Sequence, residues 1–116
     1  MRIIVAMALL LNLAAPPLAA QSSSNQMSTG NDFIDGCSSD EPNVERVGCV
    51  AYVRGLFDAF RLAKAVCPPD GVTMAQMIEI ARKSMRDNPQ TRHQPVSFLI
   101  WESWYVAFPC PKATGR

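Results

Sequence analysis

The sequence predicts an all-α fold, a small antiparallel helical bundle cross-linked by two disulfides. Three segments carry apolar residues at steps of three and four, which is the spacing of one face of an α-helix. No pair of alternating strands joined by a hairpin turn is recognisable in the sequence. Four cysteines follow an N-terminal segment typical of exported chains, and an oxidising compartment favours disulfides.

The N-terminal segment predicts a secretory signal peptide over residues 1–20. A basic start at Arg2 precedes an apolar run and then small residues that end at Ala20. A membrane anchor is the alternative, but a spanning helix needs about 20 apolar residues and prolines interrupt this run sooner. Without Arg2, the 11 basic side chains become ten, which balance the 10 acidic ones. This balance favours neither nucleic acid nor a membrane surface as a partner.

The mature chain is expected to hold one domain. Residues 21–36 predict a flexible polar leader with one short helical turn near Phe33, because the first ten of them are polar and rich in serine. The helical domain itself is placed at residues 37–110, and residues 111–116 form a C-terminal tail.

The first long helix is predicted from about Val44 to Val66. Its expected buried stripe holds Cys49, Tyr52, Val53, Leu56, Phe60 and Ala63. Gly48 and Gly55 lie inside this helix, where each glycine costs about 1 kcal/mol relative to alanine. They indicate that another backbone packs closely against the helix or that the helix bends. Pro68, soon after Val66, prevents the helix from continuing.

The second long helix is predicted to start at Thr73. Thr73 and Gln76 have the spacing of a capping box, in which each side chain accepts a hydrogen bond from a free backbone N–H. Its apolar stripe holds Met74, Met77, Ile78, Ala81 and Met85. The sequence Asp87-Asn88-Pro89 ends the helix.

The third helix is expected to begin between Pro89 and Pro95 and to end near Ala107, with Thr91 and Gln94 again at capping-box spacing. It is apolar on two sides. One stripe holds Phe98, Trp101, Tyr105 and Phe108, and the other holds Ile100, Trp104 and Ala107. One side should enter the core, and the second predicts a partner surface unless the leader or another helix covers it. Because a self-complementary patch commonly forms a two-fold dimer, we predict a homodimer interface at Trp101, Trp104 and Tyr105.

The four cysteines admit disulfides or a zinc site. The gaps between successive cysteines, 11, 17 and 42 residues, are too long for the close pairs of a structural zinc site. Cys49 and Cys67 lie near opposite ends of one predicted helix, about 27 Å apart, so they cannot bond to each other. Two pairings remain. Short links between antiparallel helices bring the ends of the first and third helices together, which favours Cys37–Cys49 and Cys67–Cys110.

No catalytic site is predicted. His93 is the single histidine, and Ser97 four residues later offers it only a weak nucleophile partner. The disulfides leave no reactive thiol, and the sequence has no phosphate-binding loop and no two-histidine metal motif. We therefore expect no enzymatic activity, no cofactor and no metal.

Several short motifs occur in order along the predicted domain. They are Cys49-x-x-Tyr52-Val53-x-Gly55-x-x-Asp58, Cys67-x-Pro69, Gly71-Val72-Thr73-x-x-Gln76, Asn88-Pro89, Arg92-His93 with Pro95, and Phe108-Pro109-Cys110. Together they resemble the Rap/Tai-type immunity proteins of bacterial type VI secretion, over about residues 37–110. The resemblance implies a periplasmic, helical, disulfide-bonded protein, often dimeric. Such a protein binds a peptidoglycan-cleaving amidase effector and blocks its active site.

The contact surface for the effector is predicted on the link between the second and third helices. Asp87, Gln90, Arg92 and His93 place polar side chains on a proline-stiffened turn, which loses little conformational entropy on entering a cleft. The chain departs from the family pattern at Tyr105 and at Val106, where more polar residues are expected. The alternative function is a general envelope interaction protein or small helical periplasmic chaperone, which would bind many unfolded clients weakly.

Overall fold

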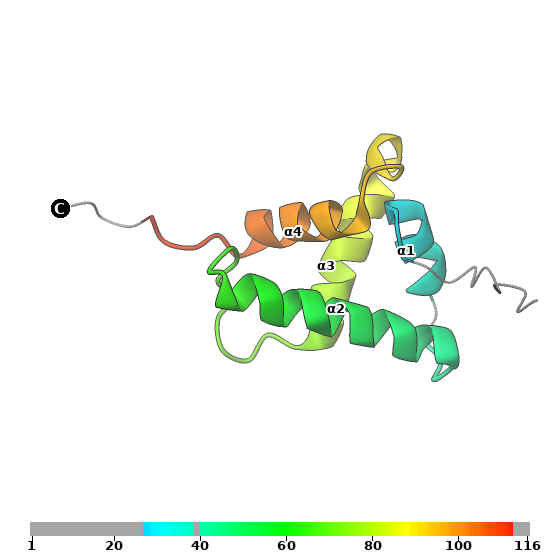
Figure 1. Cartoon of the computed structure of the whole chain (residues 1–116), viewed down its shortest axis with the longest axis horizontal. Coiled ribbons are helices and arrows are strands. Elements are labelled where there is room, and N and C mark those ends of the chain that lie inside the picture. The colour runs from blue at the N-terminus through cyan, green and yellow to red at the C-terminus, as the bar shows by residue number, and fades with distance from the viewer. Residues whose placement is uncertain (1–26, 39, 113–116) are drawn as a thin grey trace, which may run out of the picture.

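The chain is described by a computed structural model over residues 27–38 and 40–112, and all-α architecture is confirmed within these residues. The predicted signal peptide at residues 1–20 and the leader up to residue 26 lie outside the described residues. In Figure 1, α2 (Val44–Leu62) and α4 (Val96–Ala107) run across the molecule on two sides, and α3 (Met74–Asp87) crosses behind them. The short α1 (Gly30–Gly36) closes one end, and the 3₁₀ helix η1 (Pro89–Thr91) follows α3 at the top of the view, in the link to α4.

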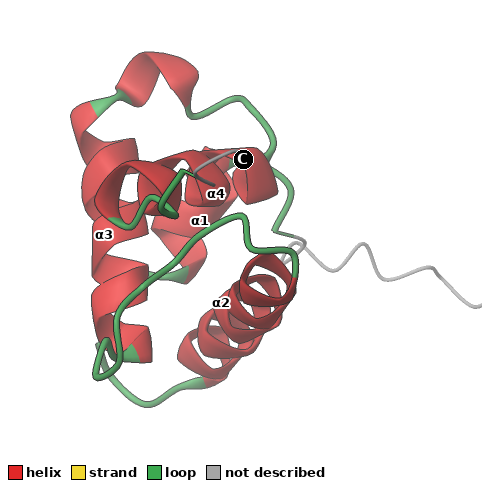
Figure 2. Cartoon of the chain, turned by 90° about the vertical axis from the view of Figure 1, so that its left-hand side faces the viewer, coloured by secondary structure: helices red, strands yellow, loops and turns green. Residues whose placement is uncertain are grey.

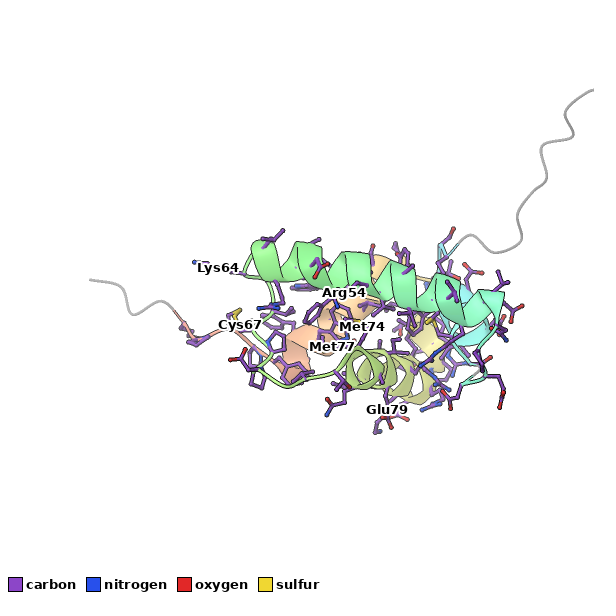
Figure 3. The ribbon with its side chains drawn as sticks, turned by 90° about the horizontal axis from the view of Figure 1, so that it is seen from below. Arg54, Lys64, Cys67, Met74, Met77 and Glu79 are labelled. Atoms are coloured by element: carbon purple, nitrogen blue, oxygen red, sulfur yellow. A yellow bond between two sulfur atoms is a disulfide. The ribbon has the colours of Figure 1, made fainter. Side chains whose placement is uncertain are left out.

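One hydrophobic core joins the helices. Figure 2 shows α2 and α3 on two sides of the molecule. In Figure 3, Met74 and Met77 lie between these two helices, and Glu79 points away from α2. Trp104 of α4 is fully buried. Its ring meets those of Phe57 and Phe60 edge-on, at centroid distances of 6.1 and 6.0 Å. Its Nε1 donates a hydrogen bond to the main-chain oxygen of Met77 at 2.9 Å. The core contains Phe33, Cys37, Cys49, Val53, Phe57, Val66, Met77, Ile78, Ala81, Met85, Val96, Leu99, Ile100 and Trp104.

The short helical turn predicted near Phe33 is the helix α1. Thr29 caps it, and the capping box is complete because the backbone N–H of Thr29 donates to the Asp32 carboxylate at 2.8 Å. Backbone hydrogen bonds attach α1 to the segment before α4: Gly30 N–H donates to Gln94, and Asn31 N–H donates to Arg92. The helix therefore belongs to the packed structure, and Phe33 at its centre is fully buried.

The helix α2 ends at Leu62, earlier than the predicted end at Val66. Lys64 adopts a left-handed backbone conformation with φ 53°. The N–H of Lys64 donates to the carbonyl of Arg61, and the N–H of Ala65 donates to the carbonyl of Phe60. These two bonds form a Schellman motif, which stops the helix. Such a stop is usually marked by glycine, and lysine at this position gave no sequence signal.

The predicted stripe of α2 is partly wrong. Cys49 and Val53 are buried as expected, but Ala63 is exposed and Phe57, which the stripe omitted, is buried. A methyl group added at Gly48 or Gly55 would meet nothing within 4 Å, so no other part of the described chain packs closely against them. The two glycines lie on the outer face of α2.

The helix α3 agrees with its prediction, and its Thr73–Gln76 capping box is present. The start of α4 differs: Pro95 precedes Val96, and no side chain caps the helix. The N–H of Val96 donates instead to the carbonyl of Ser28 at 3.0 Å, and Thr91 belongs to η1. A main-chain partner from a distant segment thus replaces the predicted Thr91 cap.

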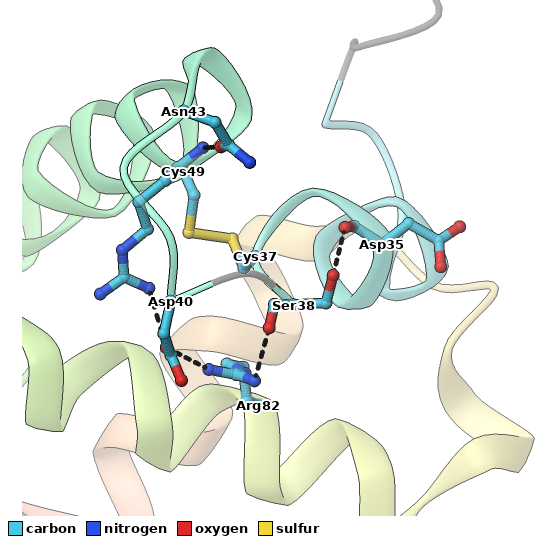
Figure 4. The surroundings of a disulfide bond; sticks show 8 residues. Asp35, Cys37, Ser38, Asp40, Asn43, Cys49 and Arg82 are labelled. Carbon is cyan, nitrogen blue, oxygen red and sulfur yellow. Dashed lines mark hydrogen bonds and ion pairs between the residues drawn. A yellow bond between two sulfur atoms is a disulfide. The ribbon is translucent and has the colours of Figure 1, made fainter.

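Both predicted disulfides are present, Cys37–Cys49 and Cys67–Cys110. The first joins the end of α1 to α2. Figure 4 shows the loop between these helices, where the Arg82 guanidinium of α3 donates to Asp40 at 3.4 Å and to the carbonyl of Ser38 at 3.2 Å. The second disulfide joins the segment after α2 to the segment after α4, in agreement with the predicted closeness of these two helix ends.

Candidate functional site

The link between α3 and α4 is a closed turn with several internal hydrogen bonds. The Asn88 amide donates to the carbonyl of Ser84 at 2.9 Å, and the hydroxyl of Thr91 donates to the carbonyl of Asn88 at 3.0 Å. Pro89 begins η1 and fixes its own φ. The turn is therefore held in one conformation by its own backbone and by polar side chains.

Arg92 anchors this link to α3. Its Nε donates to the carbonyl of Met85 at 2.6 Å and its Nη2 to that of Arg86 at 3.1 Å. These carbonyls lie in the last turn of α3, where oxygens lack helical partners. The sequence prediction placed Arg92 on the effector contact, but its half-buried side chain is committed to the chain's own backbone.

The three other predicted contact residues are exposed. Asp87 forms an ion pair with Lys83 one turn earlier, and the Gln90 amide donates to Asn88 at 3.3 Å. The His93 imidazole forms no hydrogen bond or ion pair with any described residue. The link thus presents an acid, an amide and an imidazole to solvent from a rigid turn.

An open groove of about 520 Å³ adjoins the link, between α3 and α4. Ile80 and Leu99 contribute apolar surface to it, and Lys83 and Glu102 contribute charge from opposite helices. The residues around the groove are Ile80, Lys83, Ser84, Met85, Asp87, Asn88, Thr91, Leu99, Glu102, Ser103, Val106 and Ala107. Sequence reasoning missed this groove, because it arises from the packing of two helices. Two residues singled out in the sequence lie on its rim, Asp87 and the apolar Val106, which is 76% exposed.

The outer face of α4 carries a row of aromatic rings. Trp101 stacks on Tyr105 with ring centroids 5.3 Å apart, and Phe98 lies 5.8 Å from Trp101 on the other side. Phe98 and Tyr105 are about half exposed, at 46% and 49%. The second apolar side predicted for this helix is therefore exposed. Trp104, predicted at the same interface, is instead fully buried in the core, because it lies on the side of α4 that faces α3.

A second exposed apolar surface follows α2. Val44, Val47 and Leu62 are 83%, 67% and 85% exposed, and Gly48 and Gly55 lie between them along the helix. This surface was not predicted from the sequence, because the two glycines were interpreted as a sign of close backbone packing or of a bend in the helix.

Nothing in the described part of the chain forms a recognisable catalytic or metal centre. No group of three or more His, Cys, Asp or Glu side chains lies close enough to hold a metal ion there, and all four cysteines are in disulfides. His93 and Ser97 form no hydrogen bond with each other in this part. Burial raises the pKa of Tyr52, which lies on α2 away from the link. None of the described helices is long and apolar enough to cross a membrane.

Comparison with known proteins gives one finding. A family model described as Rap1a immunity proteins matches residues 29–110, from the residue that caps α1 to the last cysteine. No curated protein and no solved structure matches the chain significantly.

Proposed function

Because the chain belongs to the Rap1a immunity protein family, we propose that it is a periplasmic immunity protein that inhibits a peptidoglycan-cleaving amidase effector of a type VI secretion system. The family match over residues 29–110 is the observation that carries this proposal. The signal-like residues 1–20 and the two disulfides support an exported location. In this role the protein occupies the effector and performs no chemistry of its own.

The α3–α4 link is the proposed contact surface. Gln90 and His93 are exposed on a turn that Pro89 and Arg92 already hold in place. A preformed turn loses little conformational entropy when it enters a cleft, which favours tight binding. The neighbouring groove adds apolar area beside the polar turn, and this combination of apolar centre and polar rim is typical of protein interfaces.

We further propose that the protein forms a homodimer through the outer face of α4. Trp101 and Tyr105 expose stacked aromatic rings there, and aromatic side chains are enriched in interfaces because they bury a large area with few rotatable bonds. The link lies at the N-terminal end of α4, whereas Tyr105 lies near its C-terminal end. A dimer at Trp101 and Tyr105 therefore leaves the link free for the effector.

Co-expression in the periplasm tests the inhibitory role. Each amidase encoded beside the gene is expressed with and without the mature protein, and lysis is followed by turbidity. Protection is expected for one amidase, with inhibition complete at equimolar protein. If the oxidised, folded protein leaves lysis unchanged for every neighbouring amidase, the immunity role is wrong. Suppression of aggregation of unrelated unfolded proteins would then favour the chaperone alternative.

A matched pair of variants tests the contact surface. The double variant Gln90→Arg/His93→Glu changes two exposed side chains of the link, so it should lose protection while keeping its melting temperature. Glu79→Gln lies on the exposed side of α3 away from α2 and should protect fully. Full protection by the link variant would show that the effector binds another surface of the protein, and the inhibitory role would stand.

A further inference from the structure

The two disulfides of the molecule lie in opposite surroundings. Cys37 and Cys49 are each 0% exposed and belong to the hydrophobic core. Cys67 is exposed and Cys110 is half-buried, at the end of the molecule where α2 and α4 finish (Figure 3). An inner and an outer disulfide can therefore be distinguished by access alone.

Access decides which disulfide an external thiol can attack. Exchange requires a thiolate to reach one sulfur of the bond, so its rate depends on exposure as well as on the thiol. The inner disulfide is fully buried, and the loop that Arg82 contacts through Ser38 and Asp40 lies beside it (Figure 4). A thiolate reaches it only after the core opens locally, whereas the outer disulfide has an exposed cysteine, Cys67, in the folded state.

The outer disulfide connects two segments that the core also holds. The N–H of Cys67 donates to the carbonyl of Phe108 at 2.9 Å, and the preceding Val66 is 2% exposed. Phe108 packs against the core, and its N–H donates to the carbonyl of Trp104 at 2.7 Å. Breaking the outer disulfide therefore removes a cross-link at the surface and leaves these core contacts and the inner disulfide in place.

We propose that Cys67–Cys110 is a site of thiol–disulfide exchange with an external dithiol, and that the helical domain stays folded when this bond is reduced. One thiolate of the dithiol bonds to the sulfur of Cys67, and the bond between Cys67 and Cys110 breaks. Cys110 leaves with the electron pair and takes up a proton. The second thiol of the reagent then displaces Cys67, so the dithiol is oxidised by two electrons and both cysteines become thiols.

The surroundings of Cys110 suit the protonated thiol that forms once its sulfur has left. Its Sγ lies 3.2 Å from the carbonyl oxygen of Lys64, so the protonated thiol can donate a weak hydrogen bond to that oxygen. Reduction also removes the covalent link between the segment after α4 and the segment after α2. Since Val106 and Ala107 line the α3–α4 groove, the end of the groove loses a covalent restraint when the outer bond opens.

Graded reduction of the full mature protein tests the proposal. The oxidised protein is incubated with increasing dithiothreitol, alkylated with iodoacetamide and digested for mass spectrometry. Alkylation of Cys67 and Cys110 is expected at reductant concentrations at least about tenfold below those that label Cys37 and Cys49, because a closed site must first open. Far-UV circular dichroism should be unchanged over this interval.

Two outcomes would overturn the proposal. One is labelling of all four cysteines together or of the inner pair first. The other is loss of helical signal at the same concentration that labels Cys67 and Cys110. The double variant Cys67→Ala/Cys110→Ala provides the control: it should show native helicity and no labelling at low reductant. If this variant does not fold, the wild-type protein with only Cys67–Cys110 reduced is the test, because its circular dichroism shows whether the domain stays helical.

Discussion

The Nε atom of Arg92 donates to the main-chain oxygen of Met85 at 2.6 Å, across the turn that connects α3 to α4. The same guanidinium donates from Nη2 to Arg86 at 3.1 Å, and the carbonyl of Arg92 accepts from the N–H of Asn31 in α1. One residue therefore fixes the end of α3, the link and the start of α1 relative to each other.

Arg92→Ala should destabilise the protein. Hydrogen bonds from a charged group contribute about 1.5–3 kcal/mol, and their loss should lower the melting temperature by roughly 10 °C in a domain of this size. Arg92→Lys is the control, because it keeps the charge but cannot reproduce both bonds, and it should recover only part of the loss. An unchanged melting temperature in Arg92→Ala would contradict this structural role and favour Arg92 as an effector contact.

Substitution by alanine should raise the free energy of unfolding at two glycines and lower it at a third. Gly48→Ala and Gly55→Ala should each stabilise the chain by about 1 kcal/mol, because an added Cβ meets nothing and alanine favours the helix. Gly30→Ala should destabilise it, because its Cβ would lie 2.6 Å from Leu99 Cδ1 and 3.1 Å from the backbone of Arg92. Urea unfolding measures all three.

The α2 variants also report on the outer face of this helix. If Gly48→Ala or Gly55→Ala loses stability, the exposed position of these glycines is wrong. If the variants are more stable but protect poorly against the effector, the outer face of α2 contributes to binding.

Lys64→Gly should stabilise the protein by about 1 kcal/mol. A left-handed backbone conformation costs an L-residue roughly this amount, and glycine adopts it freely. Lys64→Ala is the matched control: it removes the same charge but keeps the Cβ, so it should give no comparable gain. Equal melting temperatures for the two variants would show that the charge, and not the backbone conformation, determines the effect.

Tyr105→Glu should produce a soluble monomer with a nearly unchanged melting temperature, because the ring is half exposed on the proposed dimer face. Trp104→Glu should instead prevent folding, since it places a charge in the core. Light scattering at about 100 μM gives the oligomeric state, which depends on protein concentration. A monomeric wild-type protein under these conditions would contradict the homodimer.

Asp32 should make the stability of the protein depend on pH. Hydrogen bonds from the backbone and hydroxyl of Thr29, and from the backbone of Ser28, lower the pKa of its carboxyl below 3.8. A lowered pKa in the folded state gives stability that is present above 3.8 and is lost as the pH falls through the folded value. The difference in melting temperature between wild type and Asp32→Asn should therefore shrink on acidification. A constant difference would contradict the role of the charge.

Local chemistry explains which features the sequence predicted. Apolar spacing identified α2, α3 and α4, and the Thr73–Gln76 pair marked the start of α3, because these signals depend on residues close in sequence. Helix length excluded a bond between Cys49 and Cys67, and the expected antiparallel order of the helices selected the observed pairing. The end of α2 at Lys64 was missed, because a lysine in a left-handed conformation leaves no local pattern.

The candidate site was only partly predictable, because it depends on contacts between distant segments. The sequence identified the link and the exposed aromatic side of α4. It did not show that Arg92 bonds to the end of α3, that Trp104 faces the core, or that α3 and α4 enclose a groove. Each of these depends on how the helices are oriented about one another.

Each disulfide joins two cysteines that follow one another in the chain, with no other cysteine between them. A polypeptide that crosses a membrane from its N-terminus presents Cys37 and Cys49 first, so this pair can close before Cys67 arrives. Cys67 then has a single free partner, Cys110, which emerges later. On the proposed export route, oxidation in order of translocation yields the native pairing directly, without a step that reshuffles wrong bonds.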